Sequence, residues 1–311
     1  RTLLTLSLAV SVATACAETS STTPATDSGS AATDAGSTAT DAGSAGSDAG
    51  STGTDAGSTG TDTGGGGGSQ ATPMTVKEVL AMAHAAQPKV KTCPQFVNPP
   101  AGKKIAVKGL IAVTPTYSAA KTLDGLFSQS KGGGAHNGLR LVGDKASKIL
   151  ANIKAGEGFD IEGQLVIFYC EVQVQVTKIT KSADAAVMPQ ATTVTFADVG
   201  ETATPEKNNS FEASFITLNN VVVGAKEALG TDGKPHGEFW VGTATGDKEL
   251  MVKTDLKFKT TFYTYDKDTK SWATKLEDGQ KLKSITGILT YSFSHWKLVP
   301  LSDDMLVWES K

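Results

Sequence analysis

Histidines and carboxylates are the residues to test first for chemistry, because general acid–base catalysis most often uses them. The four histidines stand far apart, at His84, His136, His236 and His295. His236 and Glu238 in "PHGEFW" have the types of an acid–base pair. The alternation of apolar residues places both at a turn that enters a strand. We therefore interpret them as solvent-exposed residues at a hairpin end, and His84 as a surface or packing residue of a helix.

The motifs that carry enzymatic chemistry are missing from the sequence. It contains no HExxH, no GxSxG, no P-loop and no GxGxxG before a helix. The three cysteines have no histidines at ligand spacing, so they cannot complete a tetrahedral metal site. We predict a protein that is not an enzyme and that holds no metal and no cofactor.

Aromatic side chains are stronger candidates for a binding site. All four tryptophans lie in the second half of the chain, together with several tyrosines and phenylalanines. The candidate ligand-binding residues are Trp240, Tyr263, Tyr265, Trp272, Tyr291, Phe293 and Trp296. Two interpretations stay open: a stacking platform for a sugar, a nucleotide or a peptide, or rings that fill a core.

Charge separates the two halves of the chain. Residues 73–195 carry 14 basic and 8 acidic side chains, a net +6, whereas residues 196–311 carry 14 and 17, a net −3. Binders of single-stranded nucleic acid combine a basic groove and aromatic platforms on one face. Here the aromatic residues are in the acidic half, and Arg140 is the one arginine after the first residue. Nucleic acid is therefore an alternative ligand and not the favoured one.

The elements that position these residues are mostly strands. "KIAVKGLIAV", "FDIEGQLVI" and "VQVQV" alternate with period two in the first half. The predicted strands of the second half are "FEASFITLNNVVV", "GEFWVG", "KELMVK", "LKSITGILTY" and "HWKLVP". A short helix precedes them at "TVKEVLAMAHAAQ", where Thr75 and Glu78 have capping-box spacing. We also predict a helix at "DKASKILANI" and a hairpin that turns at "DKDTK".

Each half has five strands with a helix or loop between the third and fourth, which is the order of an OB-fold barrel. Glycines at 109, 163 and 287 stand within strands, where sharp curvature needs them. We predict a mainly β protein with two tandem OB-fold-like five-stranded barrels. The first domain covers residues 73–195, with the helix, and the second covers residues 196–311.

The stretches "VKGLIAV", "IEGQLVIF" and "ITGILTYSFSHWKLVPLSDDMLV" resemble the tandem OB-fold domains of secreted bacterial nucleases and surface lipoproteins. The helix at "TVKEVL" is similar to one that precedes the first barrel in those domains. The resemblance covers residues 73–311 and carries no catalytic motif, and there is no room for the nuclease domain. Relatives often have an arginine after the proline of the last strand, where this chain has Leu301.

Residues 1–15 have the apolar core "LLTLSLAV" of a signal peptide. The sequence does not begin with Met, so we expect more of the basic region upstream. "VATAC" resembles the lipobox of bacterial lipoproteins, with Ala13 where leucine is usual, and this implies lipidation of Cys16. By resemblance to Gram-negative sorting, Ala17 after the cysteine favours an anchor in the outer membrane.

Residues 16–72 consist of the lipidated cysteine and a repeat of Asp, Gly, Ser, Thr and Ala. Such a composition cannot bury enough apolar surface to offset chain entropy, so we predict a disordered tether. The remaining cysteines, Cys93 and Cys170, form an even pair in an exported, oxidising compartment. We predict a disulfide between them.

Together these features predict a monomeric, non-enzymatic cell-envelope lipoprotein, joined to the membrane by its lipid anchor. Its OB-fold modules would bind a macromolecule, either a protein or a glycan. One alternative is an extracytoplasmic binder of single-stranded nucleic acid. Another is a structural envelope component without a ligand site.

Overall fold

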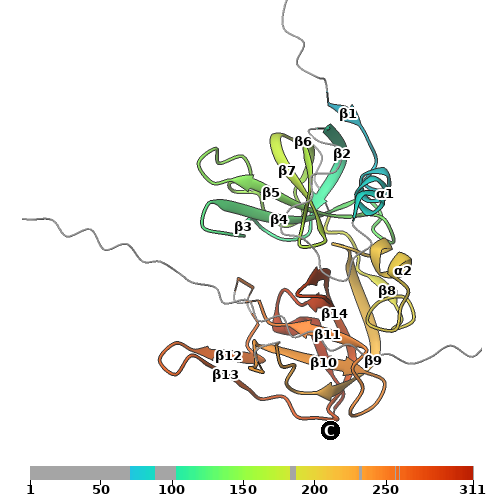
Figure 1. Cartoon of the computed structure of the whole chain (residues 1–311), viewed down its shortest axis with the longest axis vertical. Coiled ribbons are helices and arrows are strands. Elements are labelled where there is room, and N and C mark those ends of the chain that lie inside the picture. The colour runs from blue at the N-terminus through green and yellow to red at the C-terminus, as the bar shows by residue number, and fades with distance from the viewer. Residues whose placement is uncertain are drawn as a thin grey trace, which may run out of the picture. The chain divides into compact units, whose positions relative to one another are not determined.

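The computed structural model describes residues 71–87, 103–182, 187–230, 233–255, 257–258 and 260–310. The predicted signal peptide, Cys16, almost all of the predicted tether and Cys93 lie outside the described residues. Residues 65–311 belong to one compact unit. Within it the described chain folds into two barrels (Figure 1).

Helix α1 (Val76–Ala86) begins with the predicted capping box. The Thr75 Oγ1 atom accepts the Glu78 N–H at 3.2 Å, and a Glu78 carboxylate oxygen accepts the Thr75 N–H at 2.7 Å. These bonds satisfy amides that have no partner within the helix. The apolar stripe of α1, which includes Val79 and Leu80, packs into the core of the first barrel.

The first barrel has the strand order of an OB fold. Its core strands pair in the order β2-β6-β7-β5-β4, and a β2–β4 pairing closes the ring. All neighbours are antiparallel except β5 and β7, which are parallel. The strands of this sheet are β1 (Thr72–Pro73), β2 (Lys104–Ala112), β3 (Tyr117–Ser118), β4 (Leu123–Ser130), β5 (Gly138–Asp144), β6 (Gly158–Phe168) and β7 (Glu171–Lys181).

Two glycines bend the strands of this barrel as predicted. Gly109 has φ +67° at a register shift between β2 and β6, a conformation that is costly for other residues. Gly163 lies at a second shift, where an added Cβ would be 2.4 Å from the Gln175 carbonyl oxygen. Both positions need glycine for the ring to close.

The second barrel repeats the same order. Its core strands pair as β14-β15-β11-β10-β9, a β14–β9 pairing closes the ring, and β11 and β15 are parallel. The elements are β8 (Thr192–Val194), α2 (Pro205–Ser210), β9 (Phe215–Ala225), β10 (Glu238–Gly242), β11 (Leu250–Lys253), β14 (Lys281–Ser292), β15 (His295–Val299), the 3-10 helix η1 (Asp303–Met305) and β16 (Leu306–Trp308). The prediction of two five-stranded OB barrels is confirmed. Because β8 pairs with β9, the second sheet begins at Thr192.

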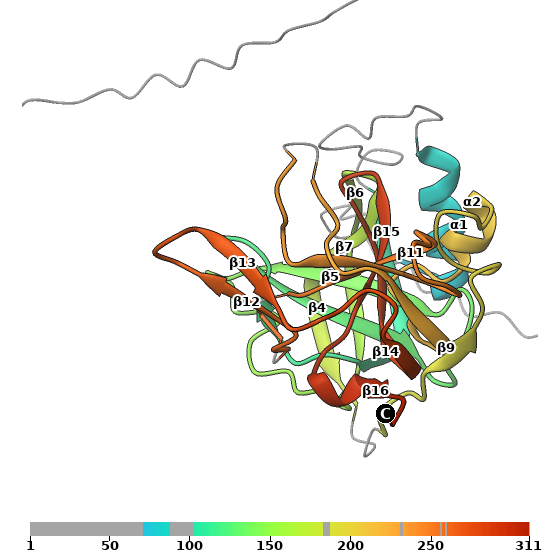
Figure 2. The ribbon, with the colours of Figure 1, turned by 90° about the horizontal axis from the view of Figure 1, so that it is seen from below.

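The segment between the third and fourth strands of the second barrel is a hairpin, as the sequence predicts. Strands β12 (Tyr263–Asp266) and β13 (Ser271–Thr274) pair only with each other and project from the barrel (Figure 2). Phe262 and Tyr263 at the base of this hairpin pack into the barrel core beside Phe239.

The helix predicted at "DKASKILANI" is wrong. These residues form successive turns between β5 and β6. Lys148 and Asn152 have φ values of +54° and +64°, which no right-handed helix allows. The apolar residues Leu150 and Ile153 of this segment are buried in the barrel core.

The two barrels meet through an apolar cluster of their own. Tyr117 and Phe127 of the first barrel pack there with Phe215 and Ile288 of the second. Ile288 therefore points between the barrels, whereas Ile285, Leu289 and Leu298 point into the core of the second barrel. Among the described residues, no helix is long and apolar enough to cross a membrane.

Candidate ligand-binding face of the second barrel

OB folds bind ligands on the outer face of their second and third strands, flanked by the loop between strands 1 and 2 and the loop between strands 4 and 5. In the second barrel this face belongs to β10 and β11. Phe239 and Val241 point into the core of the barrel. Because side chains alternate along a strand, Glu238 and Trp240 point away from this core. Strand register places Trp240 opposite Met251, and Met251 next to Lys297 of β15.

The loop between strands 4 and 5 is a two-residue turn at the edge of this face. Ser292 and His295 are the last paired residues, and Phe293 and Ser294 between them have φ values of +51° and +66°. Such a turn favours Asn-Gly, because left-handed φ costs about 1–2 kcal/mol for other residues. The Phe293 side chain is nevertheless 83 % exposed. The ring is therefore held in solvent by a backbone conformation that is costly for phenylalanine.

Trp240 and His295 stand edge to face on the outer side of the barrel. Their ring centroids are 5.5 Å apart and their planes meet at 88°. The Nδ1 atom of His295 lies 3.0 Å from a carboxylate oxygen of Glu201, which comes from the segment after β8. The carboxylate thus orients the imidazole, and both groups remain partly accessible to solvent. This arrangement offers one apolar face and two hydrogen-bonding groups.

A buried ion pair lies beneath this surface. The Lys297 Nζ atom is 2.7 Å from a Glu238 carboxylate oxygen, and the two side chains are 2 % and 9 % exposed. Burial lowers the pKa of Lys297, and the charge of Glu238 opposes the shift. The interpretation of Glu238 as a solvent-exposed hairpin residue is therefore wrong, although His236 is exposed. The Lys297 ammonium also lies 5.3 Å from the centroid of the Phe293 ring.

The remaining predicted residues fall into two other places. Tyr291 and Trp296 are paired across the β14–β15 hairpin, with their ring centroids 5.1 Å apart. They lie on the opposite side of the hairpin from His295, and Trp296 packs against the barrel core. Tyr263 is 2 % exposed and fills the core, and its hydroxyl donates to the Glu238 carbonyl oxygen at 3.2 Å.

Tyr265 and Trp272 pair on the β12–β13 hairpin at 5.1 Å. Trp272 covers Gly237 so closely that an added Cβ would be 2.7 Å from its ring. The structure thus brings Trp240 and Phe293 to one surface, with His295, Glu201 and Lys297. Sequence reasoning missed Glu201 and Lys297, because neither has a local signal.

The corresponding face of the first barrel is covered. Phe127 and Arg140 occupy its second and third strands, opposite each other, and Tyr117 comes from its loop between strands 1 and 2. All three line a cavity whose other wall is the second barrel. Arg140 binds Glu171 and packs on Phe127 inside this cavity, so the arginine is not displayed on an open surface for the backbone of a nucleic acid.

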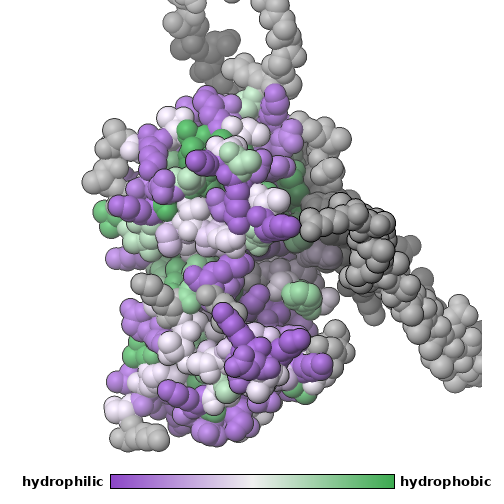
Figure 3. All heavy atoms as spheres, turned by 90° about the vertical axis from the view of Figure 1, so that its left-hand side faces the viewer, coloured by the Kyte–Doolittle hydropathy of each residue, from purple (hydrophilic) through white to green (hydrophobic). Residues whose placement is uncertain are grey.

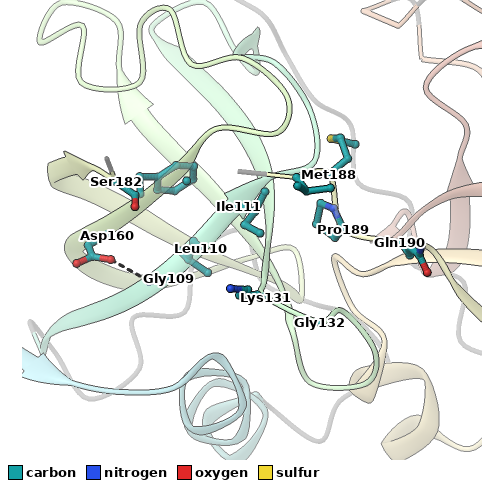
Figure 4. Close-up of a pocket in the computed structure, with 13 residues that line it drawn as sticks. Gly109, Leu110, Ile111, Lys131, Gly132, Asp160, Ser182, Met188, Pro189 and Gln190 are labelled. Carbon is teal, nitrogen blue, oxygen red and sulfur yellow. Dashed lines mark hydrogen bonds between the residues drawn. The ribbon is translucent and has the colours of Figure 1, made fainter. Parts of the chain in front are cut away.

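A larger cavity of about 440 Å³ lies on the first barrel, between β2, the loop after β4, the start of β6 and residues 187–190 (Figure 4). Its lining is mostly apolar or backbone, with Lys131 and Asp160 as the charged side chains. Asp160 accepts the Gly109 N–H at 2.8 Å, drawn as a dashed line, and so supports the bulge in β2. The cavity shows no pair of groups arranged for acid–base chemistry. Within the described ranges, no three His, Cys, Asp or Glu side chains gather as metal ligands do.

No family model and no curated protein match the chain. A crystal structure of a variant of the single-stranded DNA-binding protein from Thermus aquaticus matches with 14 % identity, over 70 % of this chain and 96 % of that one. The TM-score is 0.19, so this match says nothing about what the chain binds.

Proposed function

We propose that the chain is a non-enzymatic binding protein that holds a macromolecule, a protein or a glycan, on the outer face of its second barrel. The observation that carries this proposal is the exposed Phe293 in a strained turn, next to the Trp240–His295 pair. The equivalent turn of the first barrel, at Tyr169 and Cys170, has the same left-handed backbone, so Phe293 is distinguished by its greater exposure, 83 % against 46 % for Tyr169. The equivalent face of the first barrel is covered, which leaves the second barrel as the open one.

The surface favours a glycan over a protein. Protein interfaces have an apolar centre, whereas the large exposed hydrophobic residues here are scattered over both barrels. On the face shown in Figure 3, hydrophobic residues form small groups separated by hydrophilic ones. An aromatic ring beside an imidazole and a carboxylate suits a sugar, which presents an apolar ring face and a rim of hydroxyl groups.

An array of immobilised glycans, probed with the purified protein and with Trp240→Ala, tests this proposal. We expect binding to a defined class of glycans, and at least about a tenfold loss for the variant, the effect of removing one aromatic contact. Capture of one envelope protein, with the array negative, would assign the site to a protein. Failure of both would leave the barrels as a structural component without a ligand and would contradict the proposal.

Single-stranded nucleic acid is the second candidate, because residues 73–195 carry a net +6 on a fold that serves this purpose in other proteins. Two of the lysines are already paired: Lys178 binds Glu162 at 2.6 Å and Lys181 binds Glu157 at 2.9 Å. We expect no binding of an oligo-dT probe at low salt. Tight binding that falls steeply as salt rises would favour this candidate instead.

The envelope location is a further part of the proposal and rests on the signal peptide and the "VATAC" sequence. Cys16 would receive the lipid and hold the protein in the outer membrane. Labelling of cells with a fatty-acid analogue tests it, with Cys16→Ala as the control. Equal label in both proteins would contradict lipidation.

The Cys93–Cys170 disulfide also stays a proposal, because Cys93 lies outside the described residues. Gln87 at the end of α1 donates from Nε2 to the Cys170 carbonyl oxygen at 2.7 Å. This contact supports the proposal, because it brings the chain just before Cys93 next to Cys170. Mass spectrometry of a non-reduced digest should find the two peptides joined; two free thiols in protein from the envelope would contradict the bridge.

A further inference from the structure

A small, strongly polar cavity lies between the two barrels. Its volume is about 100 Å³. The first barrel contributes Tyr117, Arg140 and Glu171, and the second contributes side chains from the segment after β11 and from the β14–β15 hairpin, including Ser292. The cavity faces the strands that OB folds use for ligands, but it is too small for a macromolecule.

The Arg140 guanidinium is held in a fixed orientation in this cavity. Its central carbon lies 5.4 Å from the centroid of the Phe127 ring, and Nη1 binds a carboxylate oxygen of Glu171. Glu171 is fixed in turn by Gln173, whose Nε2 donates to the same oxygen at 3.0 Å. Burial opposes the positive charge of Arg140, but attraction by Glu171 raises its pKa. The arginine is therefore a permanent cation with a fixed plane.

Three polar atoms of residues that line the cavity make no well-aligned hydrogen bond within the described residues, although the Tyr117 and Arg140 side chains are close enough to shift each other's pKa. They are the Tyr117 hydroxyl, the Arg140 Nε and the Ser292 Oγ. Tyr117 is only 8 % exposed, and its ring stacks on Phe127 at 5.8 Å. Buried polar groups nearly always have partners, so three such groups around one cavity indicate a bound species. Arg140 Nε–H can only donate, and the two hydroxyls can donate as well.

The charges around the cavity indicate which class of ligand complements it. Lys253 and Lys257 join Arg140, against Glu171 and Asp255, so the lining has three cationic and two anionic side chains. The Lys257 ammonium lies 5.4 Å from the centroid of the Tyr117 ring. A ligand that accepts several hydrogen bonds and carries negative charge complements this lining.

We propose that the cavity binds a small oxyanion, a carboxylate or inorganic phosphate, between the barrels. This goes beyond the proposed function, because the cavity lies between the barrels and its lining includes neither Trp240 nor Phe293. Tyr117 and Arg140 come from one barrel and Ser292 from the other, so the bound anion would join them and stabilise the folded unit.

Thermal unfolding of the purified protein tests the site. Sodium phosphate and sodium acetate are titrated separately in the millimolar range, with sodium chloride at matched ionic strength as reference. We expect a saturable rise in the melting temperature with at least one of the two oxyanions. General stabilisation by excluded salts grows without saturation and is thereby distinguished. The anion that saturates identifies the ligand as tetrahedral phosphate or planar carboxylate.

Tyr117→Phe removes the hydroxyl and keeps the ring stacked on Phe127, and Tyr169→Phe is the matched control at an exposed tyrosine. For Tyr117→Phe we expect the half-saturating concentration of the oxyanion to rise at least about tenfold, because one hydrogen bond to an anion is lost. For the control we expect no change. Ser292→Ala provides the same test if Tyr117→Phe fails to fold. No saturable shift with either anion, or equal saturation in these variants and the natural protein, would overturn the proposal.

Discussion

The carboxylate of Glu212, which precedes the first strand of the second barrel, binds His84 on helix α1. The Oε2 atom lies 2.8 Å from His84 Nε2, and the Oε1 atom accepts the Val172 N–H of β7 at 2.6 Å. Glu212 is 1 % exposed. One buried side chain thus links the helix, the first barrel and the second barrel. The Gln129 side chain adds a second link, because its Oε1 accepts the Phe215 N–H at 3.2 Å.

Glu212→Ala should lower the free energy of unfolding by about 1–3 kcal/mol, because it leaves the buried Val172 N–H and the His84 ring without their partner. Glu206→Ala, at an exposed glutamate of α2, is the control and should change stability by less than about 0.5 kcal/mol. Urea denaturation measures both. Equal stability of the two variants would mean that the link contributes nothing.

Lys297→Met should lower the free energy of unfolding by about 3–5 kcal/mol, because it leaves the Glu238 carboxylate buried without its cation. The double variant Lys297→Met with Glu238→Gln should be more stable than the single variant, because no unpaired charge remains. A double-mutant cycle in guanidinium chloride gives the coupling energy. Additive losses would show that the two groups do not interact.

Two apolar residues of β15, Leu298 and Trp296, should both lower the stability of the protein when they are truncated. Leu298→Ala removes a fully buried core side chain and should cost about 2–5 kcal/mol. Trp296→Ala should also lower the melting temperature, because Trp296 packs against the same core. A melt unchanged by Trp296→Ala would place that ring outside the core.

Phe293→Gly should raise the free energy of unfolding by about 0.5–1 kcal/mol, although it removes a large apolar side chain. Glycine adopts the left-handed φ of +51° without the steric cost that phenylalanine has there, and this gain exceeds its extra chain entropy. Chemical denaturation of Phe293→Gly and Phe293→Ala separates the two effects. Destabilisation by glycine would show that the ring contributes to folding and not to binding.

Acid should remove the stability that the Asp247 turn provides. The Ala244 N–H and the Thr243 hydroxyl and N–H bind one Asp247 oxygen and hold the pKa of this carboxyl below its usual 3.8. Because the pKa of Asp247 is lower in the folded state than in the unfolded state, its ionised carboxylate stabilises the fold above pH 3.8. This stability is lost as the pH falls through the folded-state pKa. Asp247→Asn should therefore melt below the natural protein at pH 7 and approach it near pH 2. A difference that does not shrink with pH would contradict this origin.

Local patterns in the sequence were sufficient for much of the fold. Period-two alternation predicts the strands of both barrels, and the spacing of Thr75 and Glu78 predicts the cap of α1, because each signal needs only neighbouring residues. The helix predicted after β5 is wrong, because apolar residues at helical spacing are also compatible with successive turns that bury Leu150 and Ile153.

The candidate site depended on contacts that local patterns do not contain. Glu238 and Lys297 are distant in sequence and meet only through the parallel pairing of β11 and β15. The aromatic residues were recognised by type, but their exposure follows from strand register: Tyr263 fills a core, whereas Phe293 faces solvent. Nor does sequence show that the second barrel covers the binding face of the first.

The most direct test of the proposed binding face compares the tips of the two equivalent hairpins. Phe293 occupies the turn between strands 4 and 5 of the second barrel, and Tyr169, which is 46 % exposed, occupies the same place in the first. The measurement is binding of the purified protein, Phe293→Ala and Tyr169→Ala to the same array of immobilised glycans. We predict at least about a tenfold weaker signal for Phe293→Ala and an unchanged one for Tyr169→Ala. Binding that survives Phe293→Ala, or that is lost in Tyr169→Ala alone, would contradict a ligand site on the second barrel.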